Sequence, residues 1–294
     1  MSVLHNMGYL LDWRNLREQC GCKGCNASIL KRPLTGRKMG IRMGKDWFCS
    51  DQCFGRAVEV RIRQLQESAC REISQPESRF PLGLLLLSRG CISQAQLQLA
   101  HKQQSERGGA LGDILCELNF ATEQEVAAAA ATQWGCPVFT PKSTICEPQA
   151  RVPGAWMELY SMAPVHYVAA ARKLFIGFVY RVEHDVLRTI EELTSCMTAP
   201  CFITSSDCRQ AIRGLAPTRN DVNFDQVSSV PEIANIVRSY AFQVGAGEAR
   251  LGVCRDYVWA RLNRDGCPTD LVFSNRRDNH GNRETGPGEY LRMD

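Results

Sequence analysis

The sequence predicts an α+β protein, in which a tandem repeat of helical hairpins packs on a small mixed sheet. The first observation is internal repetition over residues 81–133, where PLGLLLLSRGCISQAQLQLAHKQQ and ALGDILCELNFATEQEVAAAAATQ match in residue type at a constant offset. The second is that segments of strand length and helical segments alternate over the following residues, up to 214. A helical layer followed by such an alternation is typical of the α+β class.

Helix-end signals occur at the same phase in both copies of the repeat. Residues 93–96 read Ser-x-x-Gln and residues 122–125 read Thr-x-x-Glu, and both are capping boxes that begin a helix. Gly90 and Asn119 also correspond, and both residue types adopt the left-handed conformation that ends a helix. Each copy is therefore expected to be a short apolar helix, a tight stop and a capped second helix. Two ordinary hairpins that only build a core are the alternative to a ligand site.

Composition and charge set broad bounds on the function. The chain of 294 residues has a net charge of +4 and a pI near 8.4, which alone indicates no particular partner. The first membrane-span candidate, residues 82–87, is too short to cross a bilayer, and charged residues near the N-terminus argue against a signal peptide. Most of the 15 cysteines are scattered singly, which suits reduced thiols, so we expect a cytoplasmic protein.

Other cysteines cluster before residue 54. The pair Cys22 and Cys25 and the pair Cys49 and Cys53 have the spacing at which two knuckles supply four thiolates to tetrahedral zinc, with Cys20 as a spare or alternative ligand. Because a segment of this size buries little apolar surface, a structural metal would supply its folding energy. Loose thiols and an iron–sulfur ligand set are the alternatives. The stretch WFCSDQCF resembles small zinc fingers of the FCS/MYM type.

A basic patch lies between the two cysteine pairs, opposed only by Asp46. Its residues are Lys31, Arg32, Arg37, Lys38, Arg42 and Lys45. Such a patch is either a solvated hairpin or a contact surface for nucleic acid, an acidic partner or a phosphate ligand. A zinc-finger regulator that binds nucleic acid is therefore an alternative function.

Periodicity and turn residues predict the other elements. The expected helices are 54–73, 182–195, 208–214 and 231–244, and the expected strands are 159–166, 173–180, 201–204, 249–254, 257–262 and 271–273. These elements define a zinc-knuckle module (1–60), a helix and linker (61–78), a repeat-and-sheet domain (79–216), a linker (217–230), a helix plus β-hairpin fragment (231–274) and a polar tail expected to be disordered (275–294).

The repeat-and-sheet domain resembles the N-terminal domain of type II secretion and type IV pilus assembly ATPases. It is similar in particular to the variant that binds cyclic-di-GMP through two tandem RLGxxLxxxGxxxxxxLxxxLxxQ motifs. The resemblance implies a ligand site formed by Arg79, Leu82, Gly83, Leu86, Gly90, Gln104, Leu111, Gly112, Leu115 and Gln133. The glycines Gly83 and Gly112 would allow close backbone approach there, and the amides of Gln104 and Gln133 would hydrogen-bond the ligand.

The arginine that opens each motif in that family is absent here. Pro81 and Ala110 stand at those positions, and neither offers the planar donor fork that suits a guanine edge or a phosphate. Arg79 and Arg107 lie nearby in the sequence and are the candidate substitutes.

Residues 261–266, RLNRDG, are similar to the start of the ATPase portion of the same family, but the motor core is missing. No GxxxxGK[ST] loop occurs in the sequence, so no site for the phosphates of a nucleoside triphosphate is expected. We therefore expect a non-enzymatic adaptor or regulator related to secretion or pilus machinery, which has machinery proteins as partners and senses cyclic-di-GMP. A motor-less subunit that pairs with a complete ATPase is a further alternative.

Overall fold

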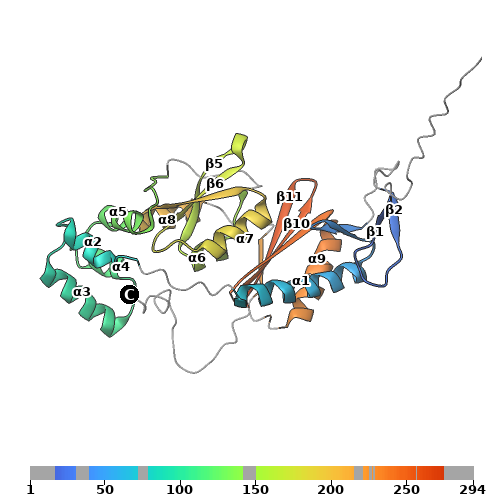
Figure 1. Ribbon diagram of the computed structural model, residues 1–294, viewed down its shortest axis with the longest axis horizontal. Coiled ribbons are helices and arrows are strands. Elements are labelled where there is room, and N and C mark those ends of the chain that lie inside the picture. Colours follow the sequence, from blue (N-terminus) through green and yellow to red (C-terminus); the bar gives the residue numbers. More distant parts are fainter. Residues whose placement is uncertain are drawn as a thin grey trace, which may run out of the picture.

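The computed structural model describes residues 17–30, 40–71, 79–141, 150–214, 221–224, 227, 229–255 and 257–274. Figure 1 shows the tandem-repeat helices at one end of an elongated molecule, a three-stranded sheet beside them and a six-stranded sheet toward the other end. The predicted α+β class is confirmed. Over these ranges, no helix combines the length and the apolar character that crossing a membrane requires.

The repeat forms four helices. They are α2 (Leu82–Ser88) and α3 (Gln94–Arg107) in the first copy, and α4 (Leu111–Glu117) and α5 (Glu123–Trp134) in the second. Both predicted capping boxes are confirmed, with Ser93 and Thr122 as the capping residues. The predicted helix stops are confirmed too, because Gly90 (φ 71°) and Asn119 (φ 56°) both adopt positive φ.

The helices of the two copies interleave. The helix α2 packs against α5 of the other copy, and α3 packs against α4. Leu86 and Leu115, which occupy corresponding positions, are both 0% exposed in the core between the helices. The two hairpins therefore share one core and depend on each other for burial.

The three-stranded sheet follows the repeat. Its strands are β5 (Met162–Val168), β6 (Lys173–Phe178) and β7 (Met197–Phe202), in the order β5-β6-β7. The strands β5 and β6 are antiparallel and joined through the short helix η3 (Ala169–Ala171), whereas β7 runs parallel to β6 after the crossover helix α7 (His184–Thr194). One face of the sheet shares a core with α6 (Gly154–Leu159) and α7, and the other packs on α8 (Ser205–Gly214).

The six-stranded sheet joins segments that are far apart in the sequence. Its order is β4 (Asp46–Phe48), β3 (Ile41–Met43), β9 (Glu248–Cys254), β10 (Tyr257–Arg264), β11 (Cys267–Ser274) and β8 (Asp221–Phe224). The strand β3 of the cysteine-rich segment runs parallel to β9, and β8, which lies in the stretch expected to be a linker, runs parallel to β11. The short strands β1 (Arg17–Gln19) and β2 (Ser28–Leu30) form a separate pair.

Both faces of this sheet are covered, as the alternation along β10 shows. Val258, Ala260 and Leu262 lie in a core built with the helices α1 (Asp51–Arg71) and α9 (Val230–Val244). Trp259 points to the opposite face, where its ring centroid lies 5.1 Å from that of Trp156 in α6. The sheet therefore separates α1 and α9 on one side from the helices of the central domain on the other.

A buried ion pair lies in the β10–β11 hairpin. Arg261 and Asp270 are cross-strand partners and are 5% and 1% exposed. The Arg261 guanidinium donates to the Asp270 carboxylate at 2.7 and 2.8 Å and to the carbonyl of Arg151 at 2.5 Å. The indole Nε1 of Trp259 also donates to Asp270, at 2.8 Å. These bonds tie the segment before α6 to the six-stranded sheet.

Removal of one partner of this pair should strongly destabilise the protein. The Asp270→Ala substitution leaves the Arg261 guanidinium buried without its carboxylate, which typically costs about 3–5 kcal/mol in the free energy of unfolding. Asp185→Ala, which breaks the exposed pair between Arg188 and Asp185, is the control and should cost less than about 1 kcal/mol. Urea unfolding measures both free energies. Equal losses would show that burial does not increase the contribution of the ion pair to stability.

Candidate functional site

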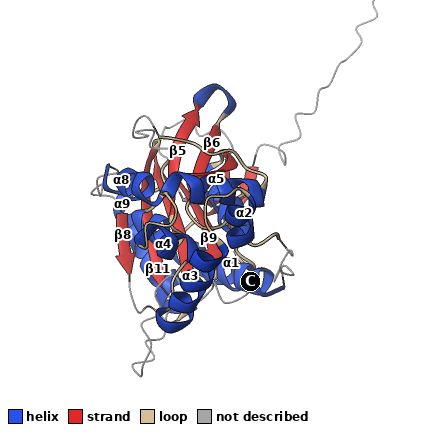
Figure 2. Ribbon diagram, turned by 90° about the vertical axis from the view of Figure 1, so that its left-hand side faces the viewer, coloured by secondary structure: helices blue, strands red, loops and turns tan. Residues whose placement is uncertain are grey.

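A pocket of about 350 Å³ lies where the two copies of the repeat meet, close to the end of β6. Figure 2 views the molecule from this end. The residues that line the pocket are Pro81, Leu82, Gly83, Leu84, Leu97, His101, Gln104, Ala110, Leu111, Gly112, Val126, Ala130, Gln133, Val179 and Tyr180. The structure thus brings six of the predicted ligand residues around one pocket, and these are Leu82, Gly83, Gln104, Leu111, Gly112 and Gln133.

The two predicted glutamines make reciprocal bonds between the copies. Gln104 Nε2 donates to the carbonyl of Gly109 at 3.1 Å, just before the second copy begins its first helix. Gln133 Nε2 donates to the carbonyl of Phe80 at 2.9 Å, at the corresponding place before the first copy. Each glutamine therefore uses its amide nitrogen to anchor the start of a motif helix. The sequence predicted instead that these amides hydrogen-bond a ligand.

The two motif glycines allow the helices of each copy to pack closely. A Cβ atom on Gly83 would lie 2.7 Å from Leu97 Cδ1, and one on Gly112 would lie 2.6 Å from Val126 Cγ1. Both separations are too short for carbon atoms that are not bonded. A side chain at either position would displace its neighbour, at little cost where the flexible end of Leu97 can move and at a higher cost at the β-branched Val126.

The other predicted ligand residues lie outside the pocket lining. Leu86 and Leu115 belong to the repeat core, and Gly90 is at the end of α2. The Arg79 guanidinium stacks on the Trp134 ring, 3.6 Å from its centroid, and donates to the Gln133 carbonyl at 3.4 Å. Arg107 pairs with Glu117 at 2.6 Å.

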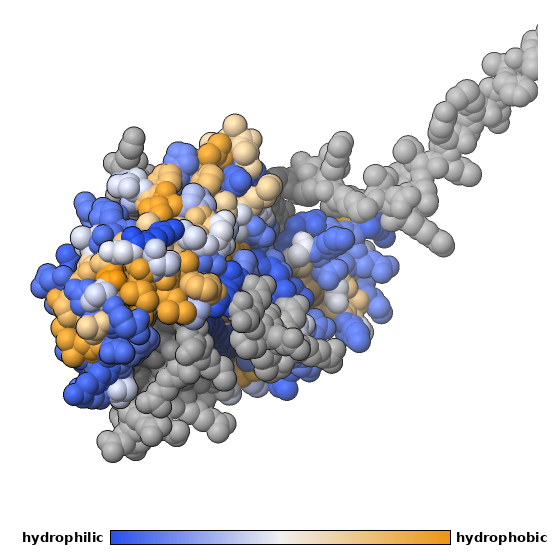
Figure 3. Space-filling view, turned by 60° about the vertical axis from the view of Figure 1, so that its left-hand side comes forward, coloured by the Kyte–Doolittle hydropathy of each residue, from blue (hydrophilic) through white to orange (hydrophobic). Residues whose placement is uncertain are grey.

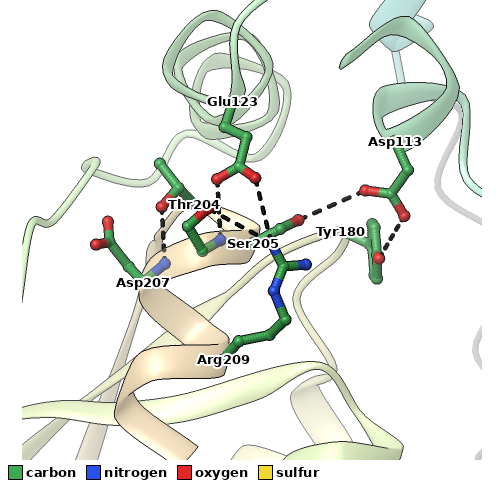
Figure 4. A network of polar contacts seen from close by, with 8 residues as sticks. Asp113, Glu123, Tyr180, Thr204, Ser205, Asp207 and Arg209 are labelled. Carbon is green, nitrogen blue, oxygen red and sulfur yellow. Dashed lines mark hydrogen bonds and ion pairs between the residues drawn. The ribbon is translucent and has the colours of Figure 1, made fainter. Parts of the chain in front are cut away.

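Tyr180 and His101 line the pocket, although the sequence did not predict them as ligand residues. His101 Nδ1 lies 3.3 Å from Gln104 Oε1. The Tyr180 hydroxyl donates to Asp113 Oδ2 at 2.6 Å, and Ser205 approaches Asp113 Oδ1 at 3.5 Å (Figure 4). His101 stands at a leucine position of the tandem motif, three residues before Gln104, which is a signal in the sequence, whereas Tyr180 lies far from the repeat in the sequence.

A polar network attaches the second copy to the three-stranded sheet (Figure 4). Glu123 of α5 accepts from the amide of Ser206 at 2.9 Å and pairs with Arg209 at 3.4 Å, at the beginning of α8. Thr204 caps the same helix, since its hydroxyl accepts from the Asp207 amide at 3.0 Å. Burial raises the pKa of Glu123, but the bonds from Ser206 and the charge of Arg209 outweigh it and lower the pKa overall.

Asp113 has the opposite balance, because burial raises its pKa despite the bond from Tyr180. A raised pKa means that the folded state holds this proton more tightly than the unfolded state. The stabilising contribution of Asp113 is therefore complete below the unfolded pKa of about 4 and is lost as the pH rises through the folded value.

Asp113→Asn should accordingly flatten this part of the pH dependence of stability. The amide oxygen still accepts from Tyr180, while the buried charge is removed. Unfolding free energies of wild type, Asp113→Asn and the exposed control Asp185→Asn, measured in urea from about pH 4 upward, test this expectation. If wild type and Asp113→Asn lose stability in parallel, Asp113 does not titrate as described.

The second candidate site is a cluster of four thiols, Cys20, Cys25, Cys49 and Cys53, whose sulfur atoms all lie within 4.8 Å of one another. Cys25 Sγ lies 3.6 Å from Cys49 Sγ, and Cys49 Sγ lies 3.8 Å from Cys53 Sγ. Four sulfurs at about 2.3 Å from one tetrahedral ion would be separated by about 3.8 Å, whereas a disulfide is about 2.05 Å long. The donor set therefore fits a single metal ion.

Cys20 is the fourth member of this group, where the cysteine spacing predicted Cys22. The Cys20 amide bonds to the Ala27 carbonyl at 2.9 Å, and Cys20 bridges to Trp47 of β4, so its backbone is fixed beside the second knuckle. Cys22 lies outside the group, with its sulfur 3.8 Å from the Lys23 carbonyl. Burial and the neighbouring Cys53 thiol raise the pKa of Cys22, so it is still close to the cluster.

The predicted basic patch lies largely outside the described residues, which include only Arg42 and Lys45 of its members. Arg42 makes a bidentate ion pair with Glu18 of β1, which neutralises its charge.

Serine substitutions should separate the ligands from the neighbouring cysteine. Replacement of Cys20, Cys25, Cys49 or Cys53 should lower the bound metal, because each supplies one corner of the tetrahedron. Cys22→Ser should retain about one ion per chain. Elemental analysis after dialysis measures the ratio, and loss of metal in Cys22→Ser with retention in Cys20→Ser would contradict the arrangement.

No protein-family model and no curated protein sequence matches the chain. Among solved structures, it is similar to MshE with cdg, at 21% identity and a TM-score of 0.38, over 46% of this chain and 98% of that one. It is also similar to the N-terminal domain of XpsE in two crystal forms. The first has 16% identity, a TM-score of 0.35, and covers 45% of this chain and 92% of that one. The second has 19% identity, a TM-score of 0.28, and covers 44% and 89%.

Proposed function

We propose that this protein is a non-catalytic adaptor or regulator related to the type II secretion and type IV pilus ATPases, with proteins of that machinery as its partners. The observation that carries the proposal is that both motif copies fold into one interleaved unit and line one pocket. The sequence contains no phosphate-binding loop of a motor ATPase, so we expect the protein to act by binding. The cysteine side chains that the structure describes form no disulfide, which suits a reducing cytoplasm.

Cyclic-di-GMP is the ligand that we propose for the pocket. The paired leucines Leu82 and Leu111 supply apolar walls, and the rings of His101 and Tyr180 supply surfaces on which a base can stack. The described lining includes no lysine or arginine, so the phosphates gain no direct charge partner there. Binding should therefore be weaker than with an arginine at the start of each motif.

Restoring one motif arginine should strengthen this binding. Pro81 is exposed at the cap of α2, so Pro81→Arg adds a guanidinium at the pocket without disturbing the core. A charge-assisted hydrogen bond should tighten the complex about tenfold or more. Pro231→Arg, which adds the same charge at the start of α9, is the matched control and should change nothing.

Isothermal titration of the metal-loaded protein with cyclic-di-GMP measures these affinities. His101→Ala should weaken binding, because it removes one ring from the pocket lining. Absence of binding in both wild type and Pro81→Arg would refute cyclic-di-GMP as the ligand, and the adaptor proposal would then rest on protein contacts alone.

Zinc is the metal that we propose for the cysteine cluster. Cys20, Cys25, Cys49 and Cys53 would hold Zn²⁺ as thiolates, and metal binding would contribute folding free energy. The cluster lies beside β3 and β4, and its last cysteine, Cys53, is in the first turn of α1. Since β3 pairs with β9, the ion would hold one edge of the six-stranded sheet in place.

A further inference from the structure

A second cavity, of about 230 Å³, lies where the end of α7 packs on the six-stranded sheet. Arg172, which follows η3, and Thr194 of α7 line one side, and residues of β9 and β10 line the other. The tandem-repeat end of the molecule presents a broad hydrophobic area (Figure 3), whereas most residues that line this cavity are polar. Pockets for drug-sized molecules measure about 300–1,000 Å³, so this cavity suits a smaller, polar ligand.

Three guanidinium groups line the cavity, and two of them are already neutralised. Arg261 is paired with the buried Asp270 at 2.7 Å, and Arg250 is paired with Glu248, which also lines the cavity, at 2.8 Å. Arg172 is exposed, and its side chain makes no ion pair or hydrogen bond with any residue that the structure describes. The lining therefore carries one uncompensated positive charge, that of Arg172.

Asn263 of β10 adds an unused donor to the lining. Its Oδ1 accepts from the amide of Gly266 at 3.0 Å, which fixes the side chain in the turn between β10 and β11. Within the described ranges, its Nδ2 has no hydrogen-bond partner. The cavity therefore combines a guanidinium on the α7 side with an amide on the sheet side, and both groups have N–H donors to offer a ligand.

The backbone at Arg172 has a conformation that suits glycine or asparagine better than arginine. Its φ of 47° and ψ of 42° lie in the left-handed region. The Arg172 amide donates to the carbonyl of Ala169 at 3.1 Å, and its carbonyl accepts from the amide of Met197 at 2.8 Å. These bonds fix the place from which the side chain extends. A strained residue beside a cavity is typical of a functional site.

We propose that this cavity binds a phosphate group between Arg172 and Asn263. A guanidinium offers a planar fork of N–H groups to phosphate oxygens, and the phosphate supplies the negative charge that Arg172 lacks. Donors on two sides of the cavity suit a tetrahedral ion, whose oxygens point in several directions. The cavity shares no lining residue with the pocket between the repeat copies, so this site is additional to the one proposed for cyclic-di-GMP.

Isothermal titration of the full-length, metal-loaded protein with inorganic phosphate, in chloride buffer at constant ionic strength, tests the proposal. Wild type should bind saturably, and phosphate should raise its Tm, because a ligand of the folded state stabilises that state. Arg172→Gln should weaken binding about tenfold or more, since it removes charge-assisted hydrogen bonds. Arg213→Gln, which removes an exposed charge in the last turn of α8, is the matched control and should leave the affinity unchanged.

Asn263→Asp tests the other side of the cavity and keeps the turn. The new carboxylate still accepts from the Gly266 amide, but it replaces the Nδ2 donor by a negatively charged oxygen. Phosphate binding should therefore be lost. Thermal unfolding without phosphate establishes that each variant is folded.

Titrations with phenyl phosphate and with acetate define the ligand. Tighter binding of phenyl phosphate than of inorganic phosphate would support the site as one for a phosphate ester, and the reverse order would support the free ion. Three results would overturn the proposal. They are no binding of either phosphate to wild type, acetate binding as tight as that of phosphate, and equal affinities in Arg172→Gln and Arg213→Gln. Arg172→Gln should leave any affinity for cyclic-di-GMP unchanged, and a parallel loss would contradict two separate sites.

Discussion

The reciprocal bonds of Gln104 and Gln133 are the constraint on which the tandem-repeat end of the molecule depends. Each amide reaches from the second helix of one copy to the carbonyl just before the first helix of the other copy, so both motif helices have a fixed starting point. With the starts fixed, Gly83 and Gly112 can lie against Leu97 and Val126, and the pocket forms between the copies. The motif is thus explained by folding before any ligand is considered.

The outer faces of the two copies make different contacts within the chain. Polar side chains of the second copy attach it to α8 and β6, whereas the first copy leaves an apolar face in solvent. The second copy is therefore attached to the rest of the chain by polar contacts that have no counterpart in the first copy. At the opposite end of the molecule, β3 links the cysteine cluster to β9, so metal binding there would support the same sheet that packs on the central domain.

Local signals in the sequence predicted the repeat well, because capping boxes and left-handed stops act through neighbouring residues. Contacts across the chain were not predictable in the same way. The strand β8, Asp-Val-Asn-Phe, alternates polar and apolar residues, but four residues are too few to predict a strand, and its partner β11 lies far along the chain. Cys20 enters the thiol cluster through backbone pairing with Ala27 and Trp47, which spacing alone does not reveal. Tyr180 reaches the pocket because β6 ends beside Asp113, a contact between distant segments.

Hydrogen exchange of glutamine variants tests the central claim, that each glutamine anchors the start of a motif helix across the repeat. Gln133→Ala should raise the exchange of the first turn of α2, whose start lies in the other copy, while α4 stays protected. Gln104→Ala should do the reverse, exposing the first turn of α4 and sparing α2. If each variant instead opens only its own helix, α5 or α3, or if neither changes α2 or α4, the reciprocal anchoring does not hold the repeat together.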